Sequence, residues 1–170
     1  MSDWQGRTVT IIGAGIGGLA LAALLRERGI PCEIFEQAPA FARVGSGIQM
    51  SPNAMRVLRA LGLEQQIRAN AFQPDIWDNR DWDTGQSTNR ALLGQQAEER
   101  YGAPYIQMHR GDLHEFLASK VPDQIIRYGK TLAEVADSGD GFRLVFEDGT
   151  DAYAAVSYTH LRAHETGYNR

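Results

Sequence analysis

The sequence is poor in the features that would assign the protein to a secreted or membrane class. Its one cysteine, Cys32, excludes an intrachain disulfide, and the thiol is expected to be a small buried hydrophobic group in a reducing compartment. No apolar run approaches the roughly 20 residues that span a bilayer. The start of the chain also lacks the charged head and apolar run of a signal peptide. These absences predict a soluble, cytoplasmic protein with no membrane partner.

Clusters of positive charge are also missing. The chain has 17 Lys and Arg against 21 Asp and Glu, a net charge of −4, and its basic residues are spread along the sequence. Nucleic acid is therefore not expected as a partner. What is present, 170 residues of which 43% are hydrophobic, is typical of one ordinary globular domain.

A strand, a glycine turn, a helix and a second strand open the chain. Residues 8–12 (TVTII) form a β-branched run that ends at the glycine cluster 13–18 (GAGIGG). Residues 19–28 are strong helix formers, and residues 32–35 (CEIF) form a second short apolar strand. This order predicts a βαβ unit and an α/β fold of the Rossmann type.

The glycine cluster has the spacing of a dinucleotide-binding turn. Gly13 permits a tight turn, Gly15 lets a pyrophosphate approach the backbone, and Gly18 lets the helix lie close to the strand. The helix N-terminus then faces the negative charge of the phosphates. Glu36, at the end of the second strand, suits the free ribose hydroxyls of FAD or NAD and argues against NADP in this site.

A second glycine-rich segment, residues 41–50, leads into another helix. Ser51 is a good N-cap, Pro52 stands at the first helical position, and apolar residues repeat at helical spacing until Gly62. The segment is expected to be a glycine loop followed by a capped helix.

Several motifs together carry a family resemblance. They are GAGIGG at 13–18, EQAP at 36–39, RVGSGIQMSPN at 43–53 and HRGDL at 109–113. In this order they resemble the FAD-dependent aromatic hydroxylases, single-component flavoprotein monooxygenases that include salicylate, 6-hydroxynicotinate and 3-hydroxybenzoate hydroxylases. The resemblance covers residues 7–155 and implies FAD rather than NAD as the cofactor.

The resemblance also implies which residues bind FAD. Gly15 and its neighbours would lie at the pyrophosphate, Glu36 at the ribose, and Arg43 with the loop that follows beside the flavin. Arg110 would reach FAD from the start of a helix over residues 112–120, and guanidinium groups suit diphosphate oxygens. Leu132 would contact the adenine end. The residues expected to bind FAD are Gly13, Gly15, Ile16, Gly18, Glu36, Gln37, Arg43, Gly47, Gln49, Arg110 and Leu132.

Gln49 departs from one branch of this family. Residues 72–107 resemble the 6-hydroxynicotinate hydroxylases, in which a catalytic histidine fills the place of Gln49. A glutamine side chain cannot act as a general base. The expected substrate is therefore a small electron-rich aromatic acid in general, and no catalytic residue is assigned.

The remaining polar and aromatic candidates favour structural roles. His109 and His114 could serve as acid and base, but they lie five residues apart around a helix start and need not share a face. Trp77 and Trp82 flank a turn at 81–86 that predicts a hairpin. Both tryptophans are expected to be packing residues, with an aromatic hairpin over a ligand pocket as the alternative.

Short strands follow in the last part of the chain. Residues 124–127, 131–136 and 142–147 have strand character, with turns at SGDG and EDGT. They predict a β-meander inserted in the fold, with residues 151–155 opening its last strand.

The end of the chain does not continue the family pattern. The resembled proteins proceed into an apolar strand and a GADG motif on the flavin, whereas residues 156–166 read VSYTHLRAHET. This string resembles one reading frame of a common transposon-type DNA sequencing adapter. We therefore expect residues 1–155 to be the N-terminal part of an FAD-binding domain that is incomplete at its C-terminus. Residues 156–170 are expected to be a non-native tail.

Two structural expectations follow from that reading of the tail. The parallel sheet would lack one strand and keep an open edge. His160 and His164 have the spacing of metal ligands but would be an accident of the tail, so that no metal site is expected.

The resemblance implies a parent enzyme that hydroxylates a small aromatic acid. NADH or NADPH would reduce FAD, and the reduced flavin would use O2 to oxidise the ring. Two alternatives remain, a nucleotide-binding module without turnover and an NAD-dependent dehydrogenase. The dehydrogenase would leave residues 43–48 and 109–113 without a role. The choice between NADH and NADPH, the aromatic acid and the oligomeric state stay open.

Overall fold

The computed structural model describes residues 7–42 and 45–159. The chain divides into two compact units, which are described separately. Unit 1 comprises residues 1–42 and 117–170, and unit 2 comprises residues 43–116. Within the described residues, no helix is long and apolar enough to cross a membrane.

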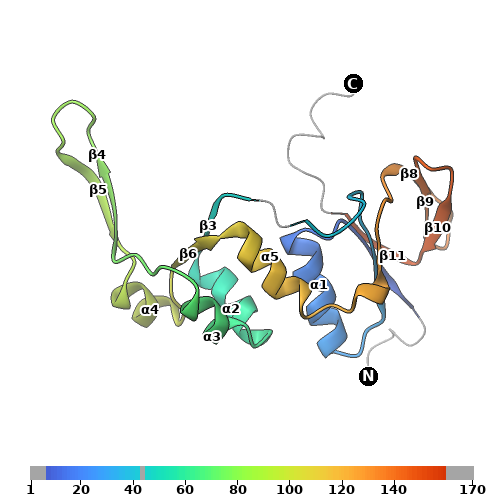
Figure 1. The fold of residues 1–170 in the computed structure, drawn as a ribbon, viewed down its shortest axis with the longest axis horizontal. Coiled ribbons are helices and arrows are strands. Elements are labelled where there is room, and N and C mark those ends of the chain that lie inside the picture. Colours follow the sequence, from blue (N-terminus) through green and yellow to red (C-terminus); the bar gives the residue numbers. More distant parts are fainter. Residues whose placement is uncertain (1–6, 43–44, 160–170) are drawn as a thin grey trace. The chain divides into compact units, whose positions relative to one another are not determined.

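Unit 1 is built on the predicted βαβ motif (Figure 1). Strand β1 (Val9–Ile12) is followed by helix α1 (Ile16–Glu27) and by strand β2 (Cys32–Phe35), which pairs with β1 in parallel from Val9↔Cys32 onward. A further short strand, β7 (Ile126–Arg127), adds to β2 in parallel. The α/β fold class is thus confirmed.

Buried apolar side chains line the contact between helix α1 and this sheet. Leu19, Ala22 and Ala23 are buried on α1, and Val9 and Ile11 are buried on β1. Cys32 is also buried, as expected for a small hydrophobic thiol, and burial raises its pKa.

The sheet edge beside β1 is paired. Strand β11 (Val156–Thr159) lies parallel to β1, with Val9↔Val156 and Ile12↔Thr159 in register, and the sheet order is β11-β1-β2-β7. The expected open edge is therefore wrong. The physical reason is that the free N–H and C=O groups of an edge strand pair with an extended backbone of any sequence. The origin of the tail stays a prediction, and His160 and His164 lie outside the described residues.

The predicted β-meander is confirmed as a three-stranded antiparallel sheet. Its order is β10 (Asp151–Ala154), β9 (Phe142–Phe146), β8 (Leu132–Asp137). The segment expected as its first strand, residues 124–127, instead forms a 3₁₀ turn, η1 (Asp123–Ile125), and strand β7 of the parallel sheet. The rings of Phe35 and Phe146 stack with centroids 4.7 Å apart, which joins the two sheets through one apolar cluster.

Unit 2 contains two antiparallel strand pairs and several helices. In chain order its elements are β3 (Gly47–Met50), α2 (Pro52–Ala60), α3 (Glu64–Ala69), β4 (Ile76–Arg80), β5 (Ser87–Leu92), α4 (Gln95–Tyr101), β6 (Ile106–His109) and α5 (Arg110–Ala118), whose last residues belong to unit 1. Ser51 is the N-cap of α2 and Pro52 its first residue, as predicted, although Ser51 makes no side-chain capping bond. Met55, Leu58, Leu61 and Ile67 form the buried side of the α2 and α3 region.

The hairpin of β4 and β5 is confirmed, and Figure 1 shows it extending away from the helices of its unit. Asp81 shapes its turn, since its Oδ1 accepts bonds from the backbone N–H of Asp83 at 3.0 Å and Thr84 at 2.8 Å. The packing role expected for the tryptophans is wrong for Trp82, which is 93% exposed because it lies in the turn beyond the paired strands. Trp77 is 40% exposed.

Candidate cofactor-binding site

The turn between β1 and α1 has the backbone that the glycine cluster predicts. Gly13 has φ +100°, a conformation that residues with a side chain rarely adopt. Its N–H donates to the carbonyl oxygen of Phe35 at 2.7 Å, which ties the turn to the end of β2. The chain then enters α1 at Gly15, the N-cap, whose carbonyl accepts from the N–H of Leu19 at 2.9 Å.

Gly18 brings α1 against the turn. A Cβ atom at Gly18 would lie 1.9 Å from the carbonyl oxygen of Gly13 and 3.3 Å from a side-chain carbon of Ile11. There is no room for a methyl group in that contact. The close helix-to-strand approach that the sequence predicts for Gly18 is thus present.

The opposite situation holds at Gly15, where the turn is open. A Cβ atom at Gly15 would meet no heavy atom within 4 Å, so a ligand can approach its backbone closely. The first turn of α1 carries no acidic residue, and no side chain caps its free N–H groups. These groups and the helix dipole favour an anion at this end of α1. The turn therefore fits a diphosphate.

Glu36 lies directly beside this turn. Its Oε2 accepts the backbone N–H of Ala14 at 2.6 Å, and its Oε1 accepts the N–H of Ala38 at 2.8 Å. A carboxylate has about four lone-pair sites, so both oxygens keep capacity for ribose hydroxyls. The structure thus brings the predicted phosphate turn and the predicted ribose acid together.

The other predicted residues of unit 1 have less specific surroundings. Ile16 is the first residue of α1 and is half-buried, and Gln37 is exposed next to Glu36. Leu132, in β8, is half-buried and packs against the cluster of Phe35, Leu144, Phe146 and Ala154. Contacts of these three residues with a cofactor stay predictions.

In unit 2, Gly47 and Gln49 lie on the ribbon of β3 and β6. Gly47 pairs with His109 and Gln49 with Gln107. The alternate residues Ile106 and Met108 are buried, so Gly47 and Gln49 stand on the exposed face. The amide oxygen of Gln49 accepts the hydroxyl proton of Tyr105 at 2.7 Å, which fixes the orientation of that amide.

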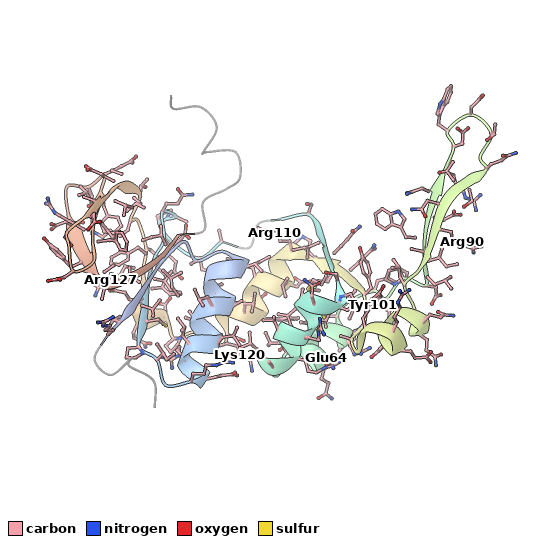
Figure 2. All side chains as sticks on the ribbon, turned by 180° about the vertical axis from the view of Figure 1, so that it is seen from behind. Glu64, Arg90, Tyr101, Arg110, Lys120 and Arg127 are labelled. Carbon is pink, nitrogen blue, oxygen red and sulfur yellow. The ribbon has the colours of Figure 1, made fainter. Side chains whose placement is uncertain are left out.

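Arg110 begins α5 directly after β6, where Figure 2 labels it. Its backbone N–H donates to the carbonyl oxygen of Ser46 at 2.8 Å. A Cβ atom at Gly45, which has φ +153°, would lie 2.8 Å from the Cβ of Arg110. The RVGSGI segment and the HRGDL motif are therefore neighbours in space. Arg43 lies outside the described residues.

The two histidines of this region have different surroundings, and the structural role expected for both stays a prediction. His109 is exposed, and its Nδ1 accepts the N–H of Gly111 at 3.2 Å, with Asp112 at 3.8 Å. His114 is half-buried in α5. Among the described residues, no group of three or more potential ligands could hold a metal ion.

The sequence did not reveal every residue that contacts the candidate site residues. Ala14 and Ala38 donate to Glu36 through their backbone N–H groups, which a pattern of side chains does not predict. Tyr105 also carried no signal as the partner of Gln49. Gly45, by contrast, stands inside the RVGSGI motif, and the glycine spacing could have indicated a close approach there.

Comparisons with known proteins agree with this geometry. The chain is 40% identical over 152 residues to the 6-hydroxynicotinate 3-monooxygenase of Pseudomonas fluorescens, which covers 89% of this chain and 40% of that protein. It is 44% identical over 146 residues to the 3-amino-4-hydroxybenzoate 2-monooxygenase of Streptomyces cremeus, covering 86% of this chain and 37% of that protein. The chain thus spans about two fifths of the length of these relatives.

A solved structure supports the same fold. Klebsiella pneumoniae HpxO, complexed with FAD and uric acid, superimposes with a TM-score of 0.74 at 24% identity, covering 91% of this chain and 39% of that one. The model of the FAD binding domain family matches residues 7–135. The resemblance to FAD-dependent hydroxylases is confirmed. Because the family model spans more than half of the chain, this protein belongs to the FAD binding domain family.

Proposed function

We propose that the turn of Gly13, Gly15 and Gly18 holds the pyrophosphate of FAD while Glu36 binds the adenosine ribose. The observation that carries this is the open backbone at Gly15 beside the Glu36 carboxylate, one oxygen of which accepts the N–H of Ala14 in the turn. Backbone N–H groups at the start of α1 would donate to the phosphate oxygens. Ile16, next to Gly15, would lie at the pyrophosphate, and Gln37 and Leu132 would lie on the adenosine side.

On the family resemblance, residues of unit 2 are proposed as further FAD ligands. Arg110 would bind diphosphate oxygens in a forked geometry, and Arg43 would add a second guanidinium. Gly47 and Gln49 would run beside the flavin. Their exposed position on the β3–β6 ribbon supports this role, because a ligand can approach that face.

We further propose that the protein is the FAD-binding part of an aromatic-acid monooxygenase. Its relatives are named for 6-hydroxynicotinate and 3-amino-4-hydroxybenzoate, both small aromatic acids with electron-donating groups. NADH or NADPH would supply two electrons as a hydride, and one atom of O2 would enter the ring while the other leaves as water. When bound, FAD supplies the oxygen chemistry, and this chain would bind and orient it. The free buried thiol of Cys32 agrees with a cytoplasmic location.

A titration of the purified chain with FAD tests the binding proposal. We expect a saturable quenching of flavin fluorescence and a yellow protein after gel filtration. NAD should not compete with FAD, since a dehydrogenase would bind NAD and carry no flavin chromophore. A colourless protein that binds NAD would contradict the proposal.

The hydroxylation proposal needs a chain as long as the relatives. In such a protein we expect NADH or NADPH oxidation in air that depends on an aromatic acid, with one oxygen atom from ¹⁸O2 in the product. The present 170 residues alone are proposed to bind without turnover, because they span about two fifths of those relatives. Turnover by the 170-residue chain would contradict that part.

A further inference from the structure

The Glu36 side chain makes two bonds that a ribose ligand does not require. One carboxylate oxygen accepts the N–H of Ala14, inside the glycine turn, at 2.6 Å. The other accepts the N–H of Ala38, in the turn after β2, at 2.8 Å. Ala14 is 7% exposed, so little water can replace the carboxylate at its N–H. The side chain thus connects two turns that are far apart in sequence.

The backbone of Glu36 is fixed by a third segment. Its N–H donates to the carbonyl oxygen of Arg127 at 2.9 Å, and its own carbonyl accepts the N–H of Lys130 at 2.8 Å. Gly129 adds a bond from its N–H to the carbonyl oxygen of Ala38 at 2.9 Å. Residues 127–130 therefore hold Glu36 in place from the side of β7. A carboxylate on a fixed backbone can in turn hold a neighbouring loop.

We propose that Glu36 is a positioning residue for the phosphate-binding turn, in addition to its role as a ribose ligand. By accepting the Ala14 N–H, it keeps the Gly13–Gly15 backbone in the shape that receives a pyrophosphate before any ligand is present. The ligand half of this inference rests on the proposed FAD site, whereas the effect on the turn does not. Recognition of the ribose and of the pyrophosphate would then be coupled through one side chain.

Two consequences distinguish this role from ribose recognition alone. First, loss of the carboxylate should loosen the turn in the ligand-free protein, because the bond from the Ala14 N–H to Glu36 is removed. Second, loss of the carboxylate should lower the affinity for ligands that have a diphosphate but no ribose hydroxyls. A residue that only reads the ribose would produce neither effect.

The first experiment is amide hydrogen exchange on the ligand-free chain, measured by NMR for Ala14 and Ala38. In Glu36→Gln, the side chain keeps one carbonyl oxygen and gains an NH2 group, so it can accept from only one of the two N–H groups. We expect exchange at Ala14 or Ala38 to accelerate at least about tenfold, which corresponds to about 1.4 kcal/mol. Glu36→Ala should accelerate both.

Glu33→Gln is the matched control for this measurement. Glu33 is also an acid on β2, but its carboxylate oxygens accept from the Thr10 hydroxyl at 3.3 Å and from Arg127 Nε at 3.4 Å, not from the glycine turn. Exchange at Ala14 should stay at the wild-type rate in this variant. Wild-type exchange at Ala14 in both Glu36 variants would overturn the proposal.

The second experiment compares ADP with 2′,3′-dideoxy-ADP by calorimetry on the wild type and on Glu36→Ala. Glu36→Ala should lower the affinity for dideoxy-ADP at least about threefold, although this probe has no ribose hydroxyl that could bind Glu36. If Glu36→Ala bound dideoxy-ADP as tightly as the wild type, the positioning role would be wrong. Failure of the wild type to bind either FAD or ADP would contradict the proposed function instead, and the exchange result would still decide the role of Glu36. Should Glu36→Ala not fold, Glu36→Gln serves for the same comparison.

Discussion

The carbonyl oxygen of Gly13 lies 1.9 Å from the place that a Cβ atom on Gly18 would occupy. Since Cβ atoms do not come within 3.0 Å of such atoms, any side chain at position 18 must push α1 away from the turn. The neighbouring Gly15 has open space at the same point. Two glycines of one motif therefore have different roles. Substituting each of them by alanine distinguishes these roles.

Gly18→Ala should destabilise the folded protein. The added methyl group would shift α1 from the turn and from Ile11, an overpacking that costs about 1–3 kcal/mol. Urea unfolding followed by circular dichroism measures the change in the free energy of unfolding. An unchanged midpoint would show that the helix does not approach the turn as closely as described.

Gly15→Ala should leave stability intact and weaken FAD. The residue has φ −73° and ψ −177°, which alanine adopts freely, and its Cβ would contact nothing within 4 Å. We expect the free energy of unfolding to stay within about 0.5 kcal/mol of the wild type. FAD affinity, from fluorescence quenching, should fall at least about tenfold because the methyl group takes the place of the pyrophosphate. Undiminished affinity would place the phosphates elsewhere.

Arg110→Lys should lower the affinity for FAD, whereas Arg100→Lys should not. Lysine keeps the charge of Arg110 but loses the planar fork that suits diphosphate oxygens. A lost charge-assisted bond of about 1.5–3 kcal/mol predicts a decrease in affinity of about 10- to 100-fold. Arg100 is an exposed arginine of α4 that lies over the ring of Tyr101, 5.3 Å from its centroid, and serves as the control. Equal affinities in both variants would remove Arg110 from the site.

The sequence predicted the parts of the fold in which local pattern and tertiary packing agree. The β-branched run at 8–12, the glycine turn and the short strand at 32–35 appear as β1, the α1 entrance and β2. Strands β3 and β6 were not predicted, because each has four residues and pairs only with a segment far along the chain. Residues 124–127 were assigned to the wrong sheet for a related reason, since strand character does not reveal the partner strand. In the candidate site, the nearness of Glu36 to the glycine turn could be predicted, whereas the backbone donor Ala14 could not.

The ion pairs of Glu64 should make the free energy of unfolding depend on pH in the acidic range. The hydrogen bond from Arg59 is the main reason that the pKa of Glu64 lies at about 2, below its ordinary 4.5, and Arg68 lowers it further against the effect of partial burial. A lowered carboxyl pKa stabilises the fold above the ordinary value, and this contribution is lost as the pH falls through the folded value. Glu64→Gln should therefore cost about 1 kcal/mol at pH 7, a small value because the Arg59 side chain is 45% exposed and screened by water.

The difference between the wild type and Glu64→Gln should be constant above about pH 5 and should fade toward pH 2. Thermal unfolding across this range measures it. Asp151→Asn is the control, because the Arg143–Asp151 pair has side chains that are 51% and 44% exposed and should contribute little. A pH-independent difference for Glu64→Gln would contradict the ionic explanation.

The origin of residues 156–170 is the last prediction. Backbone pairing of β11 with β1 does not decide it, because parallel ladder bonds use N–H and C=O groups that every such sequence offers. We expect the natural reading frame to leave the present sequence after Ala155 and to continue into an apolar strand and a GADG motif, which would then take the place of β11. Sequencing the source DNA across codon 155 with a different library chemistry measures this directly. If the cell's own DNA encodes VSYTHLRAHETGYNR, the tail is native, β11 is part of the evolved sheet, and His160 and His164 merit a zinc titration.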